Sequence, residues 1–162
     1  MSFNTVDILS NEHQVVFQKL QALAKPAEEL DRGTGGIPEI KEFSAFLEKE
    51  VTRHFDIEEK ALFPVMGRII GTESGPVYVM LMEHDDLMPK FRELIELSRN
   101  LNGSDQDGRK RAAKLARVII NSLYNHAQKE DQILFPYAQS ALTPQQKSEV
   151  DSAAEQVKIS VK

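Results

Sequence analysis

The stretch "HFDIEEKALFP" at residues 54–64 is repeated in pattern as "HAQKEDQILFP" at residues 126–136. Each copy reads His, three residues, Glu, three residues, and then Leu-Phe-Pro. Residues four apart lie on one face of an α-helix, so the His and the Glu of each copy point the same way. The repeated frame therefore predicts two related helices, each carrying an imidazole and a carboxylate in an otherwise apolar pattern. We interpret the Leu-Phe-Pro pieces themselves as core packing and a helix bend.

Three loop-like stretches divide the rest of the chain. They are "DRGTGGIP" at 31–38, "GTESGP" at 71–76 and "NLNGSDQDG" at 100–108, all rich in residues that favour turns. Between them lie segments of about 25 residues whose apolar side chains recur three and four positions apart, as in amphipathic helices. Alternation typical of strands is absent from the sequence. This pattern predicts an all-α fold, an antiparallel up-down-up-down four-helix bundle.

A short fifth helix is predicted at the C-terminal end. Thr143 would be its N-cap, and Pro144 would occupy its first turn. Its weak apolar face is formed by Val150, Ala154 and Val157. We therefore predict a four-helix bundle over residues 1–142 and a short helix over residues 143–162 that docks on it.

The apolar spacing also predicts which side chains face the bundle core. In the first segment, about Asp7 to Leu30, Pro26 should bend the last turns. In the third segment the expected stripe is Val77, Leu81, His84, Met88, Phe91 and Ile95. In the fourth it is Leu115, Ile119, Ser122, His126, Glu130, Ile133 and Tyr137.

The four histidines are expected to meet at one level of the bundle. Nearly the same number of residues separates His13 from His84 as separates His54 from His126, so the two halves look like copies of one hairpin. Each histidine lies about 25 Å from the same end of an up-down bundle, at a rise of 1.5 Å per residue. A lone inward histidine is more often a core residue than a ligand. Four at one level, accompanied by the two copies of the His-Glu frame, favour a shared site.

The two inward glutamates strengthen this interpretation. Two ionised carboxylates facing each other in an apolar core would cost several kcal/mol unless cations lay between them. Glu59, Asp131, Asp85 and Asp86 are out of phase with the inward stripe and are expected to be solvated or to support the site from outside. The candidate metal ligands are His13, His54, Glu58, His84, His126 and Glu130.

The donor types limit which metal could bind. The chain has no cysteine, which excludes thiolate ligands, iron–sulfur clusters and disulfides formed by this chain. A tetrahedral zinc site takes four ligands, fewer than are offered here. Nitrogen and oxygen donors without sulfur suit iron, manganese or zinc. The four histidines and two glutamates together predict a two-metal site. Its remaining coordination positions are left for solvent, an oxo or hydroxo bridge and a small exogenous ligand.

Composition limits the partners. The formal net charge is -5, so we expect no nucleic-acid partner. The sequence has no apolar run of about 18 residues that could span a membrane. The opening "MSFNTVDILSNEH" lacks a basic region followed by an apolar signal core, so a cytoplasmic location is expected.

From about Leu9 to Leu142 the chain resembles the hemerythrin-like, or HHE cation-binding, family. The resemblance rests on the histidine of the first segment, the Glu-His of the third, and the two HxxxE frames with Leu-Phe-Pro. It implies a non-haem di-iron centre, with zinc or manganese as possible substitutes. The implied ligands are the six residues named above, with Glu58 and Glu130 bridging. Met88 stands where the oxygen carriers of the family have a further histidine, and the ligand set is more similar to that of the bacterial iron-centre repair and stress-response branch.

The resemblance implies a small ligand such as dioxygen, peroxide or nitric oxide. Three classes of function stay open. The centre could bind or sense a diatomic molecule, it could act as a peroxidase or nitric oxide reductase, or it could store iron or donate it for repair of iron centres. Phe17, Leu87 and Met88 are expected by their helical phase to line the ligand pocket. The sequence does not indicate an oligomeric state.

Overall fold

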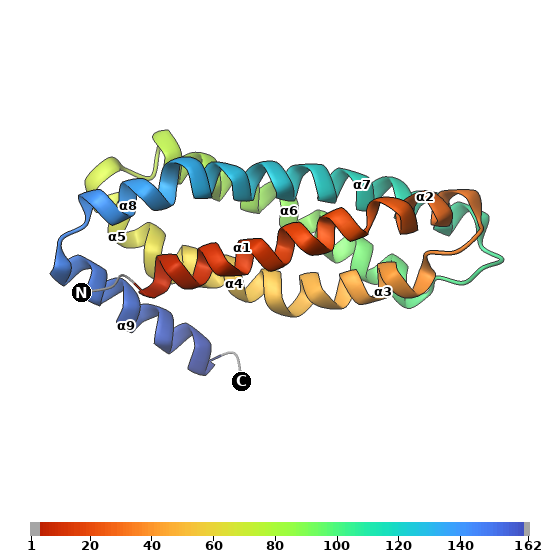
Figure 1. Cartoon of the computed structure of the whole chain (residues 1–162), viewed down its shortest axis with the longest axis horizontal. Coiled ribbons are helices and arrows are strands. Elements are labelled where there is room, and N and C mark those ends of the chain that lie inside the picture. Colours follow the sequence, from red (N-terminus) through yellow and green to blue (C-terminus); the bar gives the residue numbers. More distant parts are fainter. Residues whose placement is uncertain (1–3, 161–162) are drawn as a thin grey trace.

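The computed structural model describes residues 4–160, and within them the chain forms four helical rods and one additional helix (Figure 1). The first rod consists of α1 (Asn4–Ala22) and α2 (Ala24–Arg32). The second consists of α3 (Ile37–Phe46), η1 (Leu47–Val51), α4 (Thr52–Ile57), η2 (Glu58–Leu62) and α5 (Phe63–Ile70). The third is α6 (Gly75–Arg99), and the fourth consists of α7 (Gln106–Lys129), η3 (Glu130–Leu134) and α8 (Phe135–Ala141). The last helix is α9 (Pro144–Ser160).

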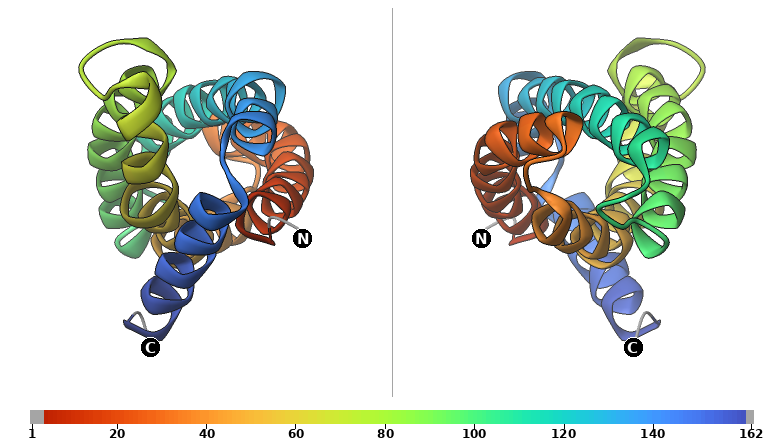
Figure 2. Two further views of the ribbon diagram at one scale, coloured as in Figure 1. Left: turned by 90° about the vertical axis from the view of Figure 1, so that its left-hand side faces the viewer. Right: turned by 90° about the vertical axis from the view of Figure 1, so that its right-hand side faces the viewer.

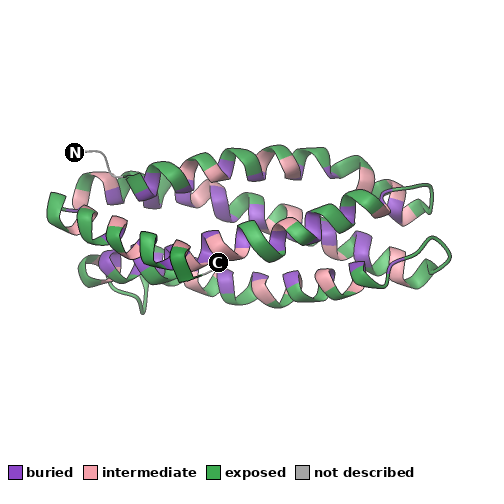
Figure 3. Cartoon of the chain, turned by 90° about the horizontal axis from the view of Figure 1, so that it is seen from below, coloured by how far each residue is buried: buried purple, intermediate pink, exposed green. Residues whose placement is uncertain are grey.

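Successive rods run in opposite directions and stand around one common axis (Figure 2). The described residues contain no strand. The predicted all-α up-down-up-down bundle with a short C-terminal helix is therefore confirmed. Buried residues line the inner sides of the rods (Figure 3). No helix between residues 4 and 160 combines the length and the apolar character needed to cross a membrane.

The first rod is interrupted three residues before Pro26, where Leu23 separates α1 from α2. The chain then turns from the first rod to the second at Gly36, whose φ is +92°. A Cβ at Gly36 would lie 2.1 Å from the carbonyl oxygen of Pro26, so a larger residue cannot occupy this turn. Pro38 lies in the first turn of α3, a favoured position for proline.

Three π-helical segments interrupt the second and fourth rods. Two of them, η2 and η3, begin at Glu58 and Glu130 and end just before a Phe-Pro pair. Each proline lies in the first turn of the following α-helix, where its missing N–H removes a backbone hydrogen bond. A π turn holds one extra residue, and such turns occur frequently at functional sites. The extra residue of each turn follows the glutamate, so Glu58 and Glu130 keep the helical phase of His54 and His126.

The π segment η3 corrects the predicted stripe of the fourth rod. Ile133 and Tyr137, expected inside, are 57% and 37% exposed, whereas Leu134 and Ala138 are buried. The extra residue of the π turn advances the inward positions after Glu130 by one. The predicted Leu115 and Ser122 are only partly buried, and Ala112, Ala116 and Leu123 fill the core instead.

The stripe of α6 is also shifted from its prediction. Val77, His84 and Phe91 are buried as expected. Leu81, Met88 and Ile95 are only partly buried, and the adjacent positions Met80, Leu87 and Leu94 lie in the core. The residues three and four positions after a core residue lie on opposite sides of it on the helix surface. Packing against the neighbouring rods, which periodicity does not contain, selects one side.

Helix α9 leaves the bundle and crosses beneath α1 and α4 (Figures 1 and 2). Its Val150, Ala154 and Val157 are buried, and it packs against η2, α4 and α1. The backbone N–H and the hydroxyl of Thr5 both donate to Asp151, at 2.9 and 2.5 Å. The division into units 1–142 and 143–162 stays a prediction.

Candidate metal centre

All six side chains proposed from the sequence come together inside the bundle. Every one is at most 5% exposed. They form two groups that share both glutamates, and in each group one donor atom of every residue lies within 4.8 Å of the others. The first group is His13, His54, Glu58 and Glu130, and the second is Glu58, His84, His126 and Glu130. The expected common level of the four histidines is therefore found.

The imidazoles face each other in pairs. The Nε2 atoms of His13 and His54 are 3.1 Å apart, and those of His84 and His126 are also 3.1 Å apart. Each pair joins two neighbouring rods, so the bundle contributes two nearly equivalent halves to the site.

Each glutamate reaches both pairs. Glu58 places one oxygen 3.5 Å from Nε2 of His54 and the other 3.3 Å from Nε2 of His84. Glu130 lies 3.1 Å from Nε2 of His13 and 3.5 Å from Nε2 of His126. A carboxylate between two imidazole pairs is the geometry from which it can bridge two cations.

A carboxylate of a neighbouring rod also orients each imidazole from behind. An ionised carboxylate only accepts hydrogen bonds, so in each case Nδ1–H of the histidine donates. The four pairs, with their Nδ1-to-oxygen distances, are His13 with Asp131 (2.9 Å), His54 with Glu12 (2.9 Å), His84 with Glu59 (2.8 Å) and His126 with Glu83 (2.9 Å). Each contact joins two neighbouring rods. Together the four contacts connect the first rod to the second, the second to the third, the third to the fourth and the fourth to the first. We call these four acids the carboxylate ring.

Only half of the carboxylate ring is predicted from the sequence. Glu59 and Asp131 are expected there outside the inward stripe, either solvated or supporting, and the structure shows the supporting role. Glu12 and Glu83 were not predicted to contact the site. The signal that could have found them is the doubled Glu-His dipeptide, since each precedes one of the clustered histidines.

Aromatic rings shield the site. Phe55 stacks on His84 with a centroid distance of 3.7 Å and an interplanar angle of 9°. Phe135 stacks on His13 at 5.4 Å and 14°. The ring centroids of Phe63 and His84 are 5.8 Å apart. The phenylalanine of each Leu-Phe-Pro piece is thus core packing, as predicted, and also a wall of the site.

Burial and nearby carboxylates set the pKa values of the metal-free site. Burial lowers the pKa of His13, but Asp131 and Glu130 outweigh it and raise the pKa to about 9. For His84, burial acts in the same way and Glu58 and Glu59 raise the pKa to about 9. Burial raises the pKa of the Glu58 carboxyl, but His54 and its other neighbours hold it well below its usual value. The interior is therefore strongly anionic until protons or cations balance it.

The donor set fits cations. When the imidazoles are neutral, none of the four carboxylate oxygens of Glu58 and Glu130 has a hydrogen-bond partner, although both side chains are fully buried. Because each Nδ1–H donates to the carboxylate ring, each neutral imidazole directs its Nε2 lone pair inward. Buried charges are normally paired or coordinate metals. The arrangement therefore has the donor atoms, orientation and charge to hold two cations that prefer nitrogen and oxygen ligands.

Comparison with known proteins agrees with this geometry. The family model described as the Hemerythrin HHE cation binding domain matches residues 4–138. The chain is 32% identical over 139 residues to the iron-sulfur cluster repair protein YtfE of Yersinia pseudotuberculosis serotype IB (strain PB1/+). It shows the same identity, over the same length, to the YtfE protein of Yersinia pestis (strain Pestoides F). In both comparisons the match covers 81% of this chain but 62% of the relative.

Proposed function

This chain belongs to the hemerythrin HHE cation-binding family, and from that premise we propose that it holds two non-haem iron ions that bind or react with a small molecule. The proposed ligands are His13, His54, Glu58, His84, His126 and Glu130. The small molecule is dioxygen, peroxide or nitric oxide. Zinc or manganese can occupy the same donor atoms.

One observation carries this proposal. The four unpartnered oxygens of Glu58 and Glu130 lie between two pairs of imidazole nitrogens, in an interior from which water is largely excluded. A structural core has no reason to bury two carboxylates in this way. With two cations present, both glutamates would be bridging ligands and each cation would have two histidines.

The residues around the donors determine how the centre works. Iron, when bound, supplies coordination positions open to a small ligand and the ability to change oxidation state. The carboxylate ring holds each imidazole in the tautomer and orientation that coordination needs. The stacked rings of Phe55 and Phe135 limit water around the open positions. The protein thereby provides a dry, oriented pocket for the metal.

A second candidate function is iron-centre repair. The relatives at 32% identity are named iron-sulfur cluster repair proteins. This chain spans less than two thirds of their length, so the activity of the whole relative comes to this chain only as a proposal. In this function the centre would donate iron to a damaged protein.

The test begins with the metal content of the protein loaded with iron under anaerobic conditions. The proposal expects two irons per chain, and one iron per fully loaded chain would contradict it. The reduced protein is then mixed with dioxygen, nitric oxide or peroxide while its optical spectrum is recorded. A reversible change supports ligand binding, and repeated consumption of the added molecule supports an enzyme. Transfer of iron to an acceptor protein with a damaged cluster, without either change, supports repair.

A further inference from the structure

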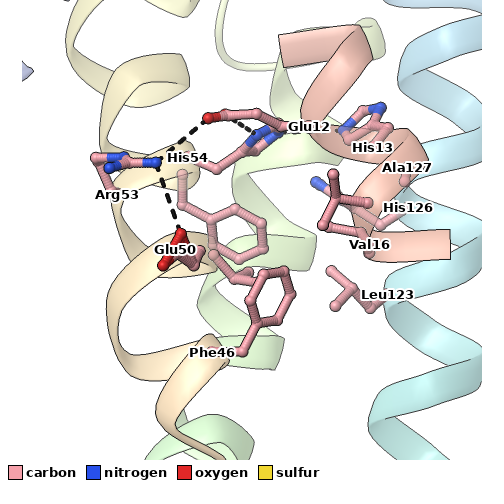
Figure 4. A pocket seen from close by; sticks show the side chains of 13 residues that line it. Glu12, His13, Val16, Phe46, Glu50, Arg53, His54, Leu123, His126 and Ala127 are labelled. Carbon is pink, nitrogen blue, oxygen red and sulfur yellow. Dashed lines mark hydrogen bonds and ion pairs between the residues drawn. The ribbon is translucent and has the colours of Figure 1, made fainter. Parts of the chain in front are cut away.

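An apolar cavity lies against the candidate metal centre between the first and second rods and reaches the fourth rod. Its volume is about 100 Å³. The imidazoles of His13, His54 and His126 border it on the inner side (Figure 4). The remaining inner lining is Val16, Phe46, Val51, Phe55, Leu123 and Ala127. None of the pocket walls expected from the sequence, Phe17, Leu87 and Met88, is among its lining residues.

The size and lining select the kind of occupant. Cavities lined by aliphatic and aromatic side chains stay dry and take up small apolar guests such as xenon. A volume of about 100 Å³ admits a molecule of only a few heavy atoms.

Charged residues close the outer side. Arg53 lies between two acids, with Nη2 3.5 Å from Glu12 and 3.8 Å from Glu50 (Figure 4). Glu12 also accepts the hydrogen bond of His54, so the mouth is connected to the candidate centre.

The second half of the internal repeat has a cavity at the equivalent place, between the third and fourth rods, but with different chemistry. It is lined by Glu83, Asp86, Leu87, Ser122, Asn125 and Lys129. Asp86 stands there at the position of Val15, which lies at the mouth of the apolar cavity, and Asn125 stands at the position of Arg53. No histidine lines it. The two halves therefore share their hairpin geometry, but only the first combines an apolar lining with contact to the imidazoles.

We propose that the apolar cavity is the binding and entry site for a small uncharged molecule, and that Arg53 closes its outer mouth. The role as an entry site rests on the proposed function, because in that function the entering molecule is the ligand of the metal centre. Occupancy of the cavity by a guest does not depend on metal.

Xenon tests occupancy directly. Crystals of the full, metal-free chain under xenon pressure should show xenon within the cavity. Val16→Phe places a ring in this space and should abolish the xenon site. Val15→Phe, at a position that is 47% exposed and tolerant of substitution, should reduce its occupancy. Asp86→Phe is the matched control in the second half and should leave xenon binding unchanged. Absence of xenon from the wild-type cavity, or an equal loss in Asp86→Phe, would overturn the proposal.

Nitric oxide tests entry. In the iron-loaded protein, Val15→Phe should slow the association of nitric oxide several-fold and Arg53→Ala should speed it, both with unchanged iron content. Equal association rates in the wild type and both variants would overturn the entry role. A chain that binds xenon but not two irons refutes the proposed function, and the entry role with it, but leaves occupancy of the cavity standing. A chain that binds two irons but no xenon refutes this inference alone.

Discussion

Asp131 accepts a hydrogen bond from Nδ1 of His13 at 2.9 Å, so the fourth rod orients an imidazole of the first. The same relationship joins every neighbouring pair of rods through the carboxylate ring. None of these contacts lies within a single rod. The orientation of each candidate ligand is therefore a property of the assembled bundle, and a change in one rod should act on the donor held by the next.

Glu58→Ala should reduce iron loading from two ions per chain to one or none. The reason is that, among residues 4–160, only Glu58 lies against both His54 and His84 through separate oxygens. Iron analysis after anaerobic loading measures the effect, and circular dichroism should show that the helices persist. Glu73→Ala, at an exposed position, is the control and should keep full loading. Two irons per chain in the Glu58 variant would contradict the proposed ligand set.

Glu12→Gln should weaken iron binding by about 10- to 100-fold, the usual cost of removing a carboxylate that orients a metal-bound histidine. Glu83→Gln should have a similar effect, because both acids hold their histidine at 2.9 Å. Competition with a chelator measures the affinity. Glu50→Gln, which removes a contact to Arg53 but none to a histidine, is the matched control. An affinity for the Glu12 variant equal to that of the Glu50 variant would argue against an orienting role.

Iron binding at pH 7 should release protons. The pKa values of His13 and His84 are about 9 in the metal-free protein, above the ordinary value of 6.5, so both imidazoles carry a proton at neutral pH. A histidine must be neutral to coordinate a metal, and the pKa of His54 is raised as well, so affinity should rise as the pH rises through about 9. Calorimetry in buffers with different ionisation enthalpies measures the released protons. A binding enthalpy that is independent of buffer at pH 7 would refute this prediction.

Phe55→Ala should lower the free energy of unfolding by about 3–5 kcal/mol, the usual range for removing a buried phenylalanine. Phe55 is 2% exposed and contacts His84, His126 and Phe91. Denaturant unfolding of the metal-free protein measures the loss, which separates packing from metal binding. Phe17→Ala, at a partly buried position, should cost clearly less. Equal losses in the two variants would show that the stack on His84 adds little to stability.

The sequence alone was sufficient for the local part of the structure. The spacing of His54 and Glu58, and of His126 and Glu130, places each pair on one helix face because an α-helix has 3.6 residues per turn. The turn-rich stretches indicated the four rods, and the matching positions of the histidines in the two halves predicted a single level. These inferences need only helix geometry and chain direction, which short-range periodicity contains.

Tertiary packing decided the rest. It chose Leu87 over Met88 for the core, because both flank His84 equally well on an isolated helix. Through the π turn it directed Leu134 rather than Ile133 inward. It also brought Glu12 to His54 and left an apolar cavity beside one half of the centre but a polar one beside the other. Such contacts depend on the rotation and register of one rod against another, which arise from the packing of many side chains at once and are not contained in the periodicity of any single segment.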